Sequence, residues 1–309
     1  MNRSDYSASS QRMPTILMCF ALMASIQLCA QDGSATQVVA KGAAPVRVGT
    51  DYAFTEGPAV DSKGNVYFTD QPNDRIFKWS TDGKIETYME GAGRSNGLYL
   101  DKAGNLWSCA DANNELWKIS KDKQHTVMVA NFEGKKFNGP NDLWIDPRGG
   151  VYFTDPFYKR DYWTRTEQEI EKQDVYYLNP DGKTVSVAAT DFMQPNGIVG
   201  SGDGKRLYVA DIRGKKTYVF DILADGRLSN RKLFAEMGSD GMTIDSEGNL
   251  YLTGKGVTVF DSTGKQIDHI AIDEPWTANV CFAGKDRKTL FVTASKSVYT
   301  VKMKVKGAH

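Results

Sequence analysis

Six side chains with an oxygen donor recur along the chain at nearly regular intervals. They are separated by 40, 45, 55, 44 and 39 positions, and the set is Glu56, Asn96, Asn141, Asn196, Asp240 and Asn279. Two carboxylates and four amides, with no thiol or imidazole, are the donor chemistry of a hard cation. We therefore expect one divalent cation, with Ca²⁺ preferred and Mg²⁺, Mn²⁺ or Zn²⁺ as alternatives.

The two acids of this set favour a cation for a second reason. We expect Glu56 and Asp240 to face a narrow, poorly solvated channel without a Lys or Arg beside them. Repulsion between like charges and loss of solvation both raise the pKa of a carboxyl group in such a setting. A divalent cation between the two carboxylates would remove both penalties.

A repeated phrase identifies the elements that position these residues. Asp-x-x-Gly, usually followed by Asn and an alternating apolar run, occurs four times clearly and twice loosely, beginning at Asp61, Asp101, Asp146, Ser201, Asp245 and Gly284. Short apolar runs separated by Asp, Asn and Gly turns flank each copy, which indicates four short strands per 40 to 55 residues. This period predicts an all-β, six-bladed β-propeller over about residues 50–304.

The last repeat supplies only three strands, so its fourth must come from elsewhere. We expect the amino end of the fold to add it, through either 37–40 or 46–48, which closes the ring and covers a sheet edge. The product is a six-bladed propeller closed by an N-terminal strand that joins the last blade.

Each of the six oxygen-bearing residues stands at the head of the strand before a copy of the phrase. Innermost strands line the central channel of a propeller, so we expect the six side chains to ring one of its mouths. For single members another explanation stays open, because Asx-Gly at a strand start is also ordinary turn chemistry. Glu56 followed by Gly57 and Pro58 fits that explanation poorly.

Residues 156–174 form a charged and aromatic insertion between the second and third strands of the third blade. We predict a short helix over Thr166–Lys172, and both a lid and a solvated excursion stay open for the segment. Its aromatic side chains either favour an apolar substrate or pack the loop on the blade: Phe157, Tyr158, Tyr162 and Trp163. The acids that end second strands are interpreted as turn caps: Asp70, Asp111, Asp155 and Asp211.

Composition excludes several classes of protein. The 309 residues include 38 basic and 38 acidic side chains, with 40% hydrophobic residues. These values exclude a disordered chain and give no overall basic field for nucleic acid. Cys109 and Cys281 lie in apolar runs, where small buried thiols are more common than a disulfide. The three histidines, His125, His269 and His309, are too few and too dispersed for a histidine-based metal site.

Residues 1–30 are interpreted as an export signal. Two arginines precede the apolar run 16–24, which is too short to span a bilayer, and a cleavage point follows near Ala30. We expect residues 31–309 to form one propeller domain, exported to the periplasm or secreted. No membrane span and no nucleic-acid partner is expected, and the protein should be a monomer or a weak oligomer.

These motifs resemble those of the gluconolactonases and the related regucalcin (senescence marker protein) lactonases. The matching segments extend in order over all six blades: Phe54–Pro58, Asn138–Leu143, Tyr152–Tyr158, Pro195–Ile198, Asp240–Met242 and Asn279–Asp286. The resemblance implies a six-bladed propeller with one divalent cation in its channel, held by Glu56, Asn196 and Asp240. It also implies that Asp240 is the acid/base of the reaction.

The resemblance also implies residues on the substrate side of the pocket. Asn141 matches a residue assigned to substrate or to an outer metal position, and we include it among the metal ligands. Asn138, and Tyr158 in the aromatic loop after the third blade's second strand, match residues on the substrate side of the pocket in relatives. Lys136 stands where some relatives offer Arg to substrate.

The function expected from this set is metal-dependent hydrolysis of a lactone, most simply a sugar lactone. The cation would polarise the carbonyl, Asp240 would take a proton from water, and Asn96 and Asn141 would bond substrate hydroxyls. Two other classes stay open. One is a non-catalytic ligand- or protein-binding propeller, since NHL-type propellers share the repeated phrase, and the other is a metal-dependent esterase or phosphotriesterase.

Overall fold

The structure, a computed structural model, describes residues 37–309. Its regular elements in that range are strands, apart from one 3-10 helix, η1 (Gln71–Asn73). No helix there has the length and apolarity needed to cross a bilayer. The expected export signal, residues 1–30, lies outside the described residues.

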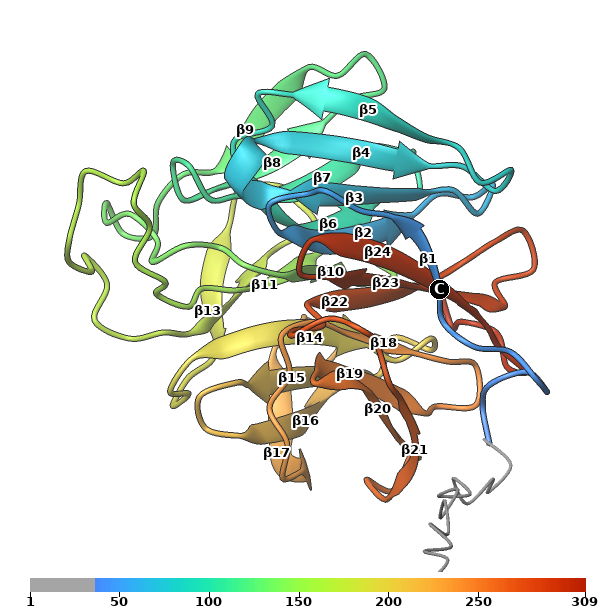
Figure 1. Ribbon diagram of the computed structural model, residues 1–309. Helices are drawn as coiled ribbons and strands as arrows, with labels where there is room; N and C mark the ends of the chain where they lie inside the picture. The colour runs from blue at the N-terminus through green and yellow to red at the C-terminus, as the bar shows by residue number, and fades with distance from the viewer. Residues whose placement is uncertain (1–36) are drawn as a thin grey trace, which may run out of the picture. The chain divides into compact units, whose positions relative to one another are not determined.

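The strands form six four-stranded antiparallel sheets, the six blades expected from the repeat (Figure 1). The first three blades are β2 (Thr55–Val60), β3 (Val66–Asp70), β4 (Arg75–Trp79) and β5 (Ile85–Glu90); β6 (Ser95–Leu100), β7 (Leu106–Ala110), β8 (Glu115–Ile119) and β9 (His125–Val129); and β10 (Leu143–Ile145), β11 (Val151–Thr154), β12 (Val175–Leu178) and β13 (Val185–Ala189).

The fourth and fifth blades follow the same order from the innermost strand outward. They are β14 (Pro195–Gly200), β15 (Arg206–Asp211), β16 (Lys216–Ile222) and β17 (Leu228–Ala235); and β18 (Met242–Ile244), β19 (Leu250–Gly254), β20 (Gly256–Phe260) and β21 (Gln266–Ile270). The sixth blade has β22 (Asn279–Ala283), β23 (Thr289–Ala294), β24 (Ser297–Lys302) and, at its outer edge, β1 (Val46–Gly49).

Closure of the ring by the amino end is confirmed. Strand β1 pairs antiparallel with β24, with Val46 opposite Thr300, and the two strands lie side by side in Figure 1. The other candidate segment, 37–40, contributes only an isolated bridge between Val39 and Met303. The chain therefore covers the edge of its last blade with its own first strand.

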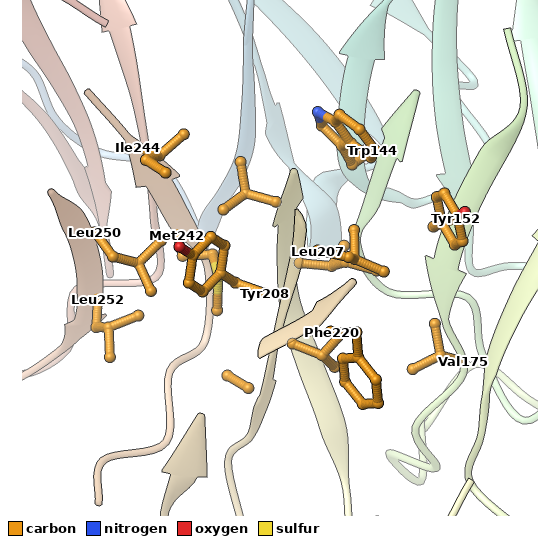
Figure 2. Close-up of a cluster of buried hydrophobic side chains, with 14 of the residues drawn as sticks. Trp144, Tyr152, Val175, Leu207, Tyr208, Phe220, Met242, Ile244, Leu250 and Leu252 are labelled. Carbon is orange, nitrogen blue, oxygen red and sulfur yellow. The ribbon is translucent and has the colours of Figure 1, made fainter. Parts of the chain in front are cut away.

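Apolar side chains between neighbouring blades hold the ring together. In the cluster of Figure 2, Trp144 and Tyr152 from the third blade, Leu207 from the fourth and Leu250 from the fifth are all buried. Strands buried on both faces read as near-continuous apolar runs, and the outer strands alternate because one face meets solvent. Cys109 and Cys281 are both buried and free, as expected.

The repeated phrase proves to be a turn held by its first residue. Asp61 Oδ1 accepts hydrogen bonds from the backbone N–H of Lys63 at 2.8 Å and of Asn65 at 2.9 Å, and Oδ2 accepts from Asn65 Nδ2 at 2.8 Å. Asp101 and Asp245 make the same three contacts. These turns join the innermost strand to the second strand, at the end of the channel away from the strand heads.

Three of the acids at the ends of second strands are turn caps, as expected. Asp70, Asp155 and Asp211 each accept hydrogen bonds from two successive backbone N–H groups in the connector that enters the innermost strand of the same blade. The same interpretation of Asp111 is wrong. Its carboxylate instead binds side chains of the insertion, Arg160 and Tyr162.

Neighbouring innermost strands approach so closely that only glycine fits between them. A Cβ atom on Gly97 would lie 2.6 Å from the carbonyl oxygen of Asn141, and one on Gly57 would lie 2.0 Å from that of Asn96. Asn96 and Asn196 lie inside strands β6 and β14. The glycines that follow them, Gly97 and Gly197, are therefore required by close strand packing around the channel. The ordinary-turn explanation does not apply to Asn96 and Asn196.

Threonine hydroxyls in the second strands tie one blade to the next. Thr154 in β11 is fully buried; its Oγ1 donates to the carbonyl oxygen of Asn196 at 2.8 Å and accepts from the Asp142 N–H at 3.2 Å. Thr69 and Thr253 make corresponding bonds to Asn96 and Ala278. These bonds fix the backbone of the strands that carry the polar head residues.

We expect Thr154→Val to destabilise the protein by about 2 kcal/mol, because the isosteric change leaves a buried N–H and a buried carbonyl without this partner. Urea unfolding measures the change. Thr126→Val in β9 is the matched control, since Thr126 is exposed, and its effect should stay within about 0.5 kcal/mol. Equal stability of the two variants would show that the inter-blade bond contributes nothing.

Candidate active site

A cavity of about 230 Å³ opens where the innermost strands begin. Five of the six oxygen-bearing head residues line it: Glu56, Asn96, Asn141, Asn196 and Asp240. The rest of the lining is Phe54, Gln71, Tyr158, Arg160, Ile212 and Trp276. The innermost strands of five blades thus bring polar side chains that are up to 184 positions apart, from Glu56 to Asp240, into one cavity.

The expectation that all six ring this mouth is wrong for Asn279. Its Nδ2 donates to Asp142 Oδ2 at 3.2 Å, and its Oδ1 accepts from the N–H of Val280 at 2.8 Å. The side chain lines a larger cavity, which the later residues of the innermost strands border. Asn279 and Asp142 therefore form a polar layer of the channel next to the lining, and Asn279 lowers the pKa of Glu56 through a side-chain hydrogen bond.

Asp240 is held by two donors. Asn196 Nδ2 donates to Asp240 Oδ1 at 2.8 Å, and Trp276 Nε1 donates to Oδ2 at 2.6 Å. Asn196 Nδ2 also lies 2.8 Å from the hydroxyl of Tyr158, so its amide nitrogen is engaged on both sides. The carboxylate orientation is fixed by Asn196 of β14 and by Trp276 in the connection between β21 and β22.

Two amide oxygens at the site are buried without a hydrogen-bond donor among residues 37–309. They are Oδ1 of Asn96 and Oδ1 of Asn196. A buried acceptor without a partner is costly, and such atoms in a native fold require an explanation. A cation bound by these oxygens satisfies both of them.

The two acids of the cavity repel each other in a dry environment. Glu56 and Asp240 are 5% and 9% exposed. Burial and the charge of Asp240 raise the pKa of Glu56 well above its usual range. Burial also raises the pKa of Asp240, against the hydrogen bonds from Trp276 and Asn196. Neither carboxylate has an ion pair with Lys, Arg or His in the described part of the chain.

One part of the expected electrostatics needs correction. Arg160 does reach the cavity, and its charge is among the causes that lower the pKa of Asp240. Its ion pair, however, is with Asp111, and its Nε lies 2.8 Å from Asp111 Oδ2. The repeat could not predict that Arg160 reaches the cavity, because this residue lies in the irregular insertion and not at a strand head.

The donor set fits a hard cation. Carboxylate and amide oxygens are the ligands that Ca²⁺ prefers, and Mg²⁺ uses the same chemistry with fewer protein ligands. Across residues 37–309 no three His, Cys, Asp or Glu side chains cluster closely enough to hold a metal. Any ion here would therefore depend on amide oxygens as well as on Glu56 and Asp240.

The structure places the remaining candidate residues unequally. Asn141 and Tyr158 line the cavity, but Lys136 and Asn138 do not. Asn138 is fully buried, and its Nδ2 donates to the carbonyl oxygen of Lys172 at 2.9 Å. Lys136 is exposed. Both precede Gly139 and Pro140 in the connector, where they contact the insertion at Glu169 and Lys172. The chain reaches the cavity only at Asn141.

The insertion packs against the second and third blades. Trp163 Nε1 donates to the carbonyl oxygen of Asp111 at 2.8 Å, and the ring of Phe157 lies 6.0 Å from that of Trp163. Packing therefore accounts for Trp163 and Tyr162, and Tyr158 alone of the four aromatic residues lines the cavity. The helix expected over Thr166–Lys172 is wrong, since this stretch consists of bends and irregular backbone.

Sequence reasoning also missed Trp276 and Gln71 of the lining, for different reasons. Trp276 lies three positions before Asn279, and only its indole contact with Asp240 reveals a role. Gln71 follows the cap Asp70 and reaches Asp111 at 3.1 Å. A Gln beside the acid that ends β3 was the available signal, but nothing in its spacing distinguishes it from a turn residue.

Comparison with known proteins shows the family to which the chain belongs. The family described as SMP-30/Gluconolactonase/LRE-like region matches residues 54–296. The chain belongs to this family. Gluconolactonase of Zymomonas mobilis is 28% identical over 290 residues, which cover 84% of this chain and 81% of that protein.

Two further members of the comparison bear on the site. The crystal structure of a gluconolactonase from Xanthomonas campestris has a TM-score of 0.80 and 27% identity, and covers 86% of this family member and 91% of that chain. Diisopropyl-fluorophosphatase of Loligo vulgaris is 28% identical over 279 residues, covering 80% of this chain and 87% of that protein.

We expect a divalent cation to stabilise the protein more at about pH 7.5 than at about pH 5. Without a cation, the raised pKa values of Glu56 and Asp240 stabilise the fold at a pH below about 4, the pKa of these groups in the unfolded chain. This stability is lost as the pH rises through the pKa values of the folded protein. Bound Ca²⁺ compensates for ionisation of the pair, by about 3 kcal/mol at a hundredfold excess over its dissociation constant. Thermal unfolding with Ca²⁺ and with chelator measures the difference at each pH.

Asp240→Asn should abolish most of this cation-dependent shift. Asp101→Asn is the control, because Asp101 holds a turn at the other end of the innermost strands. A shift of the same size in Asp240→Asn and in the native protein would place the cation elsewhere.

Proposed function

We propose that this family member is a divalent-metal-dependent hydrolase that opens a lactone ring in the cavity at the strand heads. The observation that carries the proposal is the pair of buried carboxylates, Glu56 and Asp240, beside two amide oxygens without donors. A binding module has no need for this costly arrangement. Family membership and the names of the relatives support the same reaction class.

The cation in this proposal is Ca²⁺, held by Glu56, Asn196, Asp240 and Asn141. The fit rests on the donor chemistry of these residues, which is oxygen only. When bound, the cation would polarise the lactone carbonyl and stabilise the charge that develops on its oxygen. The orphaned Oδ1 of Asn196 supports a ligand role for that residue.

Asp240 is the base of the proposed reaction. Trp276 and Asn196 hold its two oxygens in place through hydrogen bonds of 2.6 and 2.8 Å. A water in the cavity that loses its proton to Asp240 attacks the acyl carbon, and the proton is then available to the leaving hydroxyl. Because Asp240 must be ionised to act, activity falls as pH falls through its pKa.

The substrate proposed is a small polyhydroxylated lactone. A cavity of about 230 Å³ lies below the range usual for drug-sized ligands, which favours a molecule of monosaccharide size. Asn96, Asn141 and Tyr158 supply hydrogen-bonding groups for ring hydroxyls, and Phe54 and Ile212 give the lining an apolar part.

A second candidate is hydrolysis of an activated phosphotriester, a reaction related to the fluorophosphate hydrolysis that the name of the Loligo vulgaris relative indicates. The same cation and the same carboxylate would serve it. A substrate panel that includes both a sugar lactone and an aryl phosphotriester separates the two, and the substrate with the larger kcat/KM identifies the principal activity.

Removal of the cation or of the base should abolish lactone opening. Chelator and Asp240→Asn are each expected to lower kcat/KM for glucono-lactone by about 100-fold to 10,000-fold, the range for a general acid–base group. A pH-stat assay corrected for spontaneous opening measures the rate, and Asp101→Asn is the control that should stay active. Unchanged rates in both treatments would leave a non-catalytic binding propeller.

We also propose that the protein is exported, which rests on the charged and apolar pattern of residues 1–30. Mass analysis of protein recovered from the periplasm or culture medium should find an amino end near Gln31. Recovery of the chain only from the cytoplasm, with Met1 retained, would contradict export.

A further inference from the structure

Among residues 37–309, Arg160 is the only basic side chain in the lining of the candidate cavity. The roles assigned above to metal ligands and to the base do not use it. It comes from the insertion, residues 156–174, whereas the proposed metal ligands come from strand heads. The residue is therefore free to recognise a part of the substrate that the reaction itself does not change.

A buried carboxylate holds one side of the Arg160 guanidinium. Nε donates to Asp111 Oδ2 at 2.8 Å, with the Asp111 side chain 3% exposed and that of Arg160 24% exposed. Asp111 also accepts from Gln71 Nε2 at 3.1 Å and from the Tyr162 hydroxyl. Three donors thus converge on Oδ2 of this carboxylate, which holds the arginine from outside the cavity lining.

The terminal nitrogens of Arg160 are left available. Within residues 37–309 the Nε bond is the one hydrogen bond of this guanidinium, and neither terminal nitrogen is among the buried atoms without a partner. The ring of Tyr158 lies 5.3 Å from its central carbon and supports the plane. An arginine held in this way offers a planar fork of donors, the geometry that binds carboxylate or phosphate in bidentate fashion.

The charge of the cavity points to the same ligand chemistry. Its titratable lining consists of Glu56, Asp240, Tyr158 and Arg160. A divalent cation would offset the two carboxylates, and Asp111 pairs with Arg160 Nε from outside the lining. The terminal nitrogens of Arg160 are then the positively charged donors that a substrate can reach. The other lining residues are amides and apolar or aromatic side chains, which supply no further negative charge.

We propose that Arg160 is a specificity residue and that the lactone carries an anionic group, a carboxylate or a phosphate, which binds its terminal nitrogens. This inference rests on the proposed function, and it identifies the substrate class within it. The small cavity places ring and anion on one compact molecule, such as the lactone of a dicarboxylic or phosphorylated sugar acid. A reaction that oxidises an anionic sugar at its anomeric carbon would supply such a lactone.

The test compares glucono-lactone with its phosphorylated counterpart and with the lactone of the corresponding dicarboxylic acid. The native protein should show a higher kcat/KM for an anionic lactone, and the better of the two anions identifies the group that is bound. Arg160→Met should lower the ratio of anionic to neutral kcat/KM by about 10- to 100-fold, chiefly through KM.

Arg165→Met is the matched control. Arg165 lies in the same loop, stacks 4.4 Å from the ring of Trp163 and is absent from the cavity lining. This variant should leave the anionic-to-neutral ratio unchanged. Equal use of neutral and anionic lactones by the native protein, or the same loss of ratio in both variants, would overturn the proposal.

A binding measurement separates failure of this inference from failure of the proposed function. Calorimetry with the open-chain phosphorylated and dicarboxylic acids, with Ca²⁺ present, should show binding to the native protein and at least tenfold weaker binding to Arg160→Met. If no lactone is opened but this difference persists, the hydrolase fails and the anion site stands. If Arg160→Met does not fold, Arg160→Lys is measured, and unchanged binding and ratio there would refute the need for a planar fork.

Discussion

Repulsion between two buried carboxylates is the constraint on which the site depends. Glu56 is the second residue of β2, Asp240 lies two residues before β18, and both are almost fully removed from water. Neither has an ion-pair partner among the described residues. A fold keeps such a pair only when something of opposite charge enters between them or when the acids are protonated. The amide oxygens beside them lack donors too, so the whole lining has a surplus of acceptors.

The propeller holds these groups rigidly because its blades are joined at the channel itself. Gly97 lets β6 approach the carbonyl of Asn141 in the next blade, and their backbones bond at 2.7 Å. Thr154 then bonds the backbone of Asn196 one blade further on. Asn141 and Asn196 are thus each fixed by a bond from the neighbouring blade to their own backbone carbonyl. Sites built on rigid strands keep their geometry better than sites carried by loops.

The regular part of the molecule could be predicted from sequence because its causes are local and repeated. The turn that Asp61 holds recurs with the same contacts at Asp101 and Asp245, so one phrase revealed the blade period and the strand heads. The irregular part could not be predicted in this way. Nothing in the repeat shows that Asn279 turns toward Asp142, or that residues 136–138 pass behind the insertion before Asn141 enters the cavity.

Asp111 shows why departures from the repeat matter most for the site. In its counterparts Asp70, Asp155 and Asp211, both carboxylate oxygens accept hydrogen bonds from backbone N–H groups of the same blade. In the second blade the Asp111 carboxylate is available, and the insertion of the third blade uses it to hold Arg160 and Tyr162. The position that caps a turn in three blades thus holds a positively charged side chain at the cavity when it occurs in the second blade. In the proposed site, specificity arises where one blade departs from the pattern of the others, because the strand heads supply carboxylates and amides but no positively charged side chain.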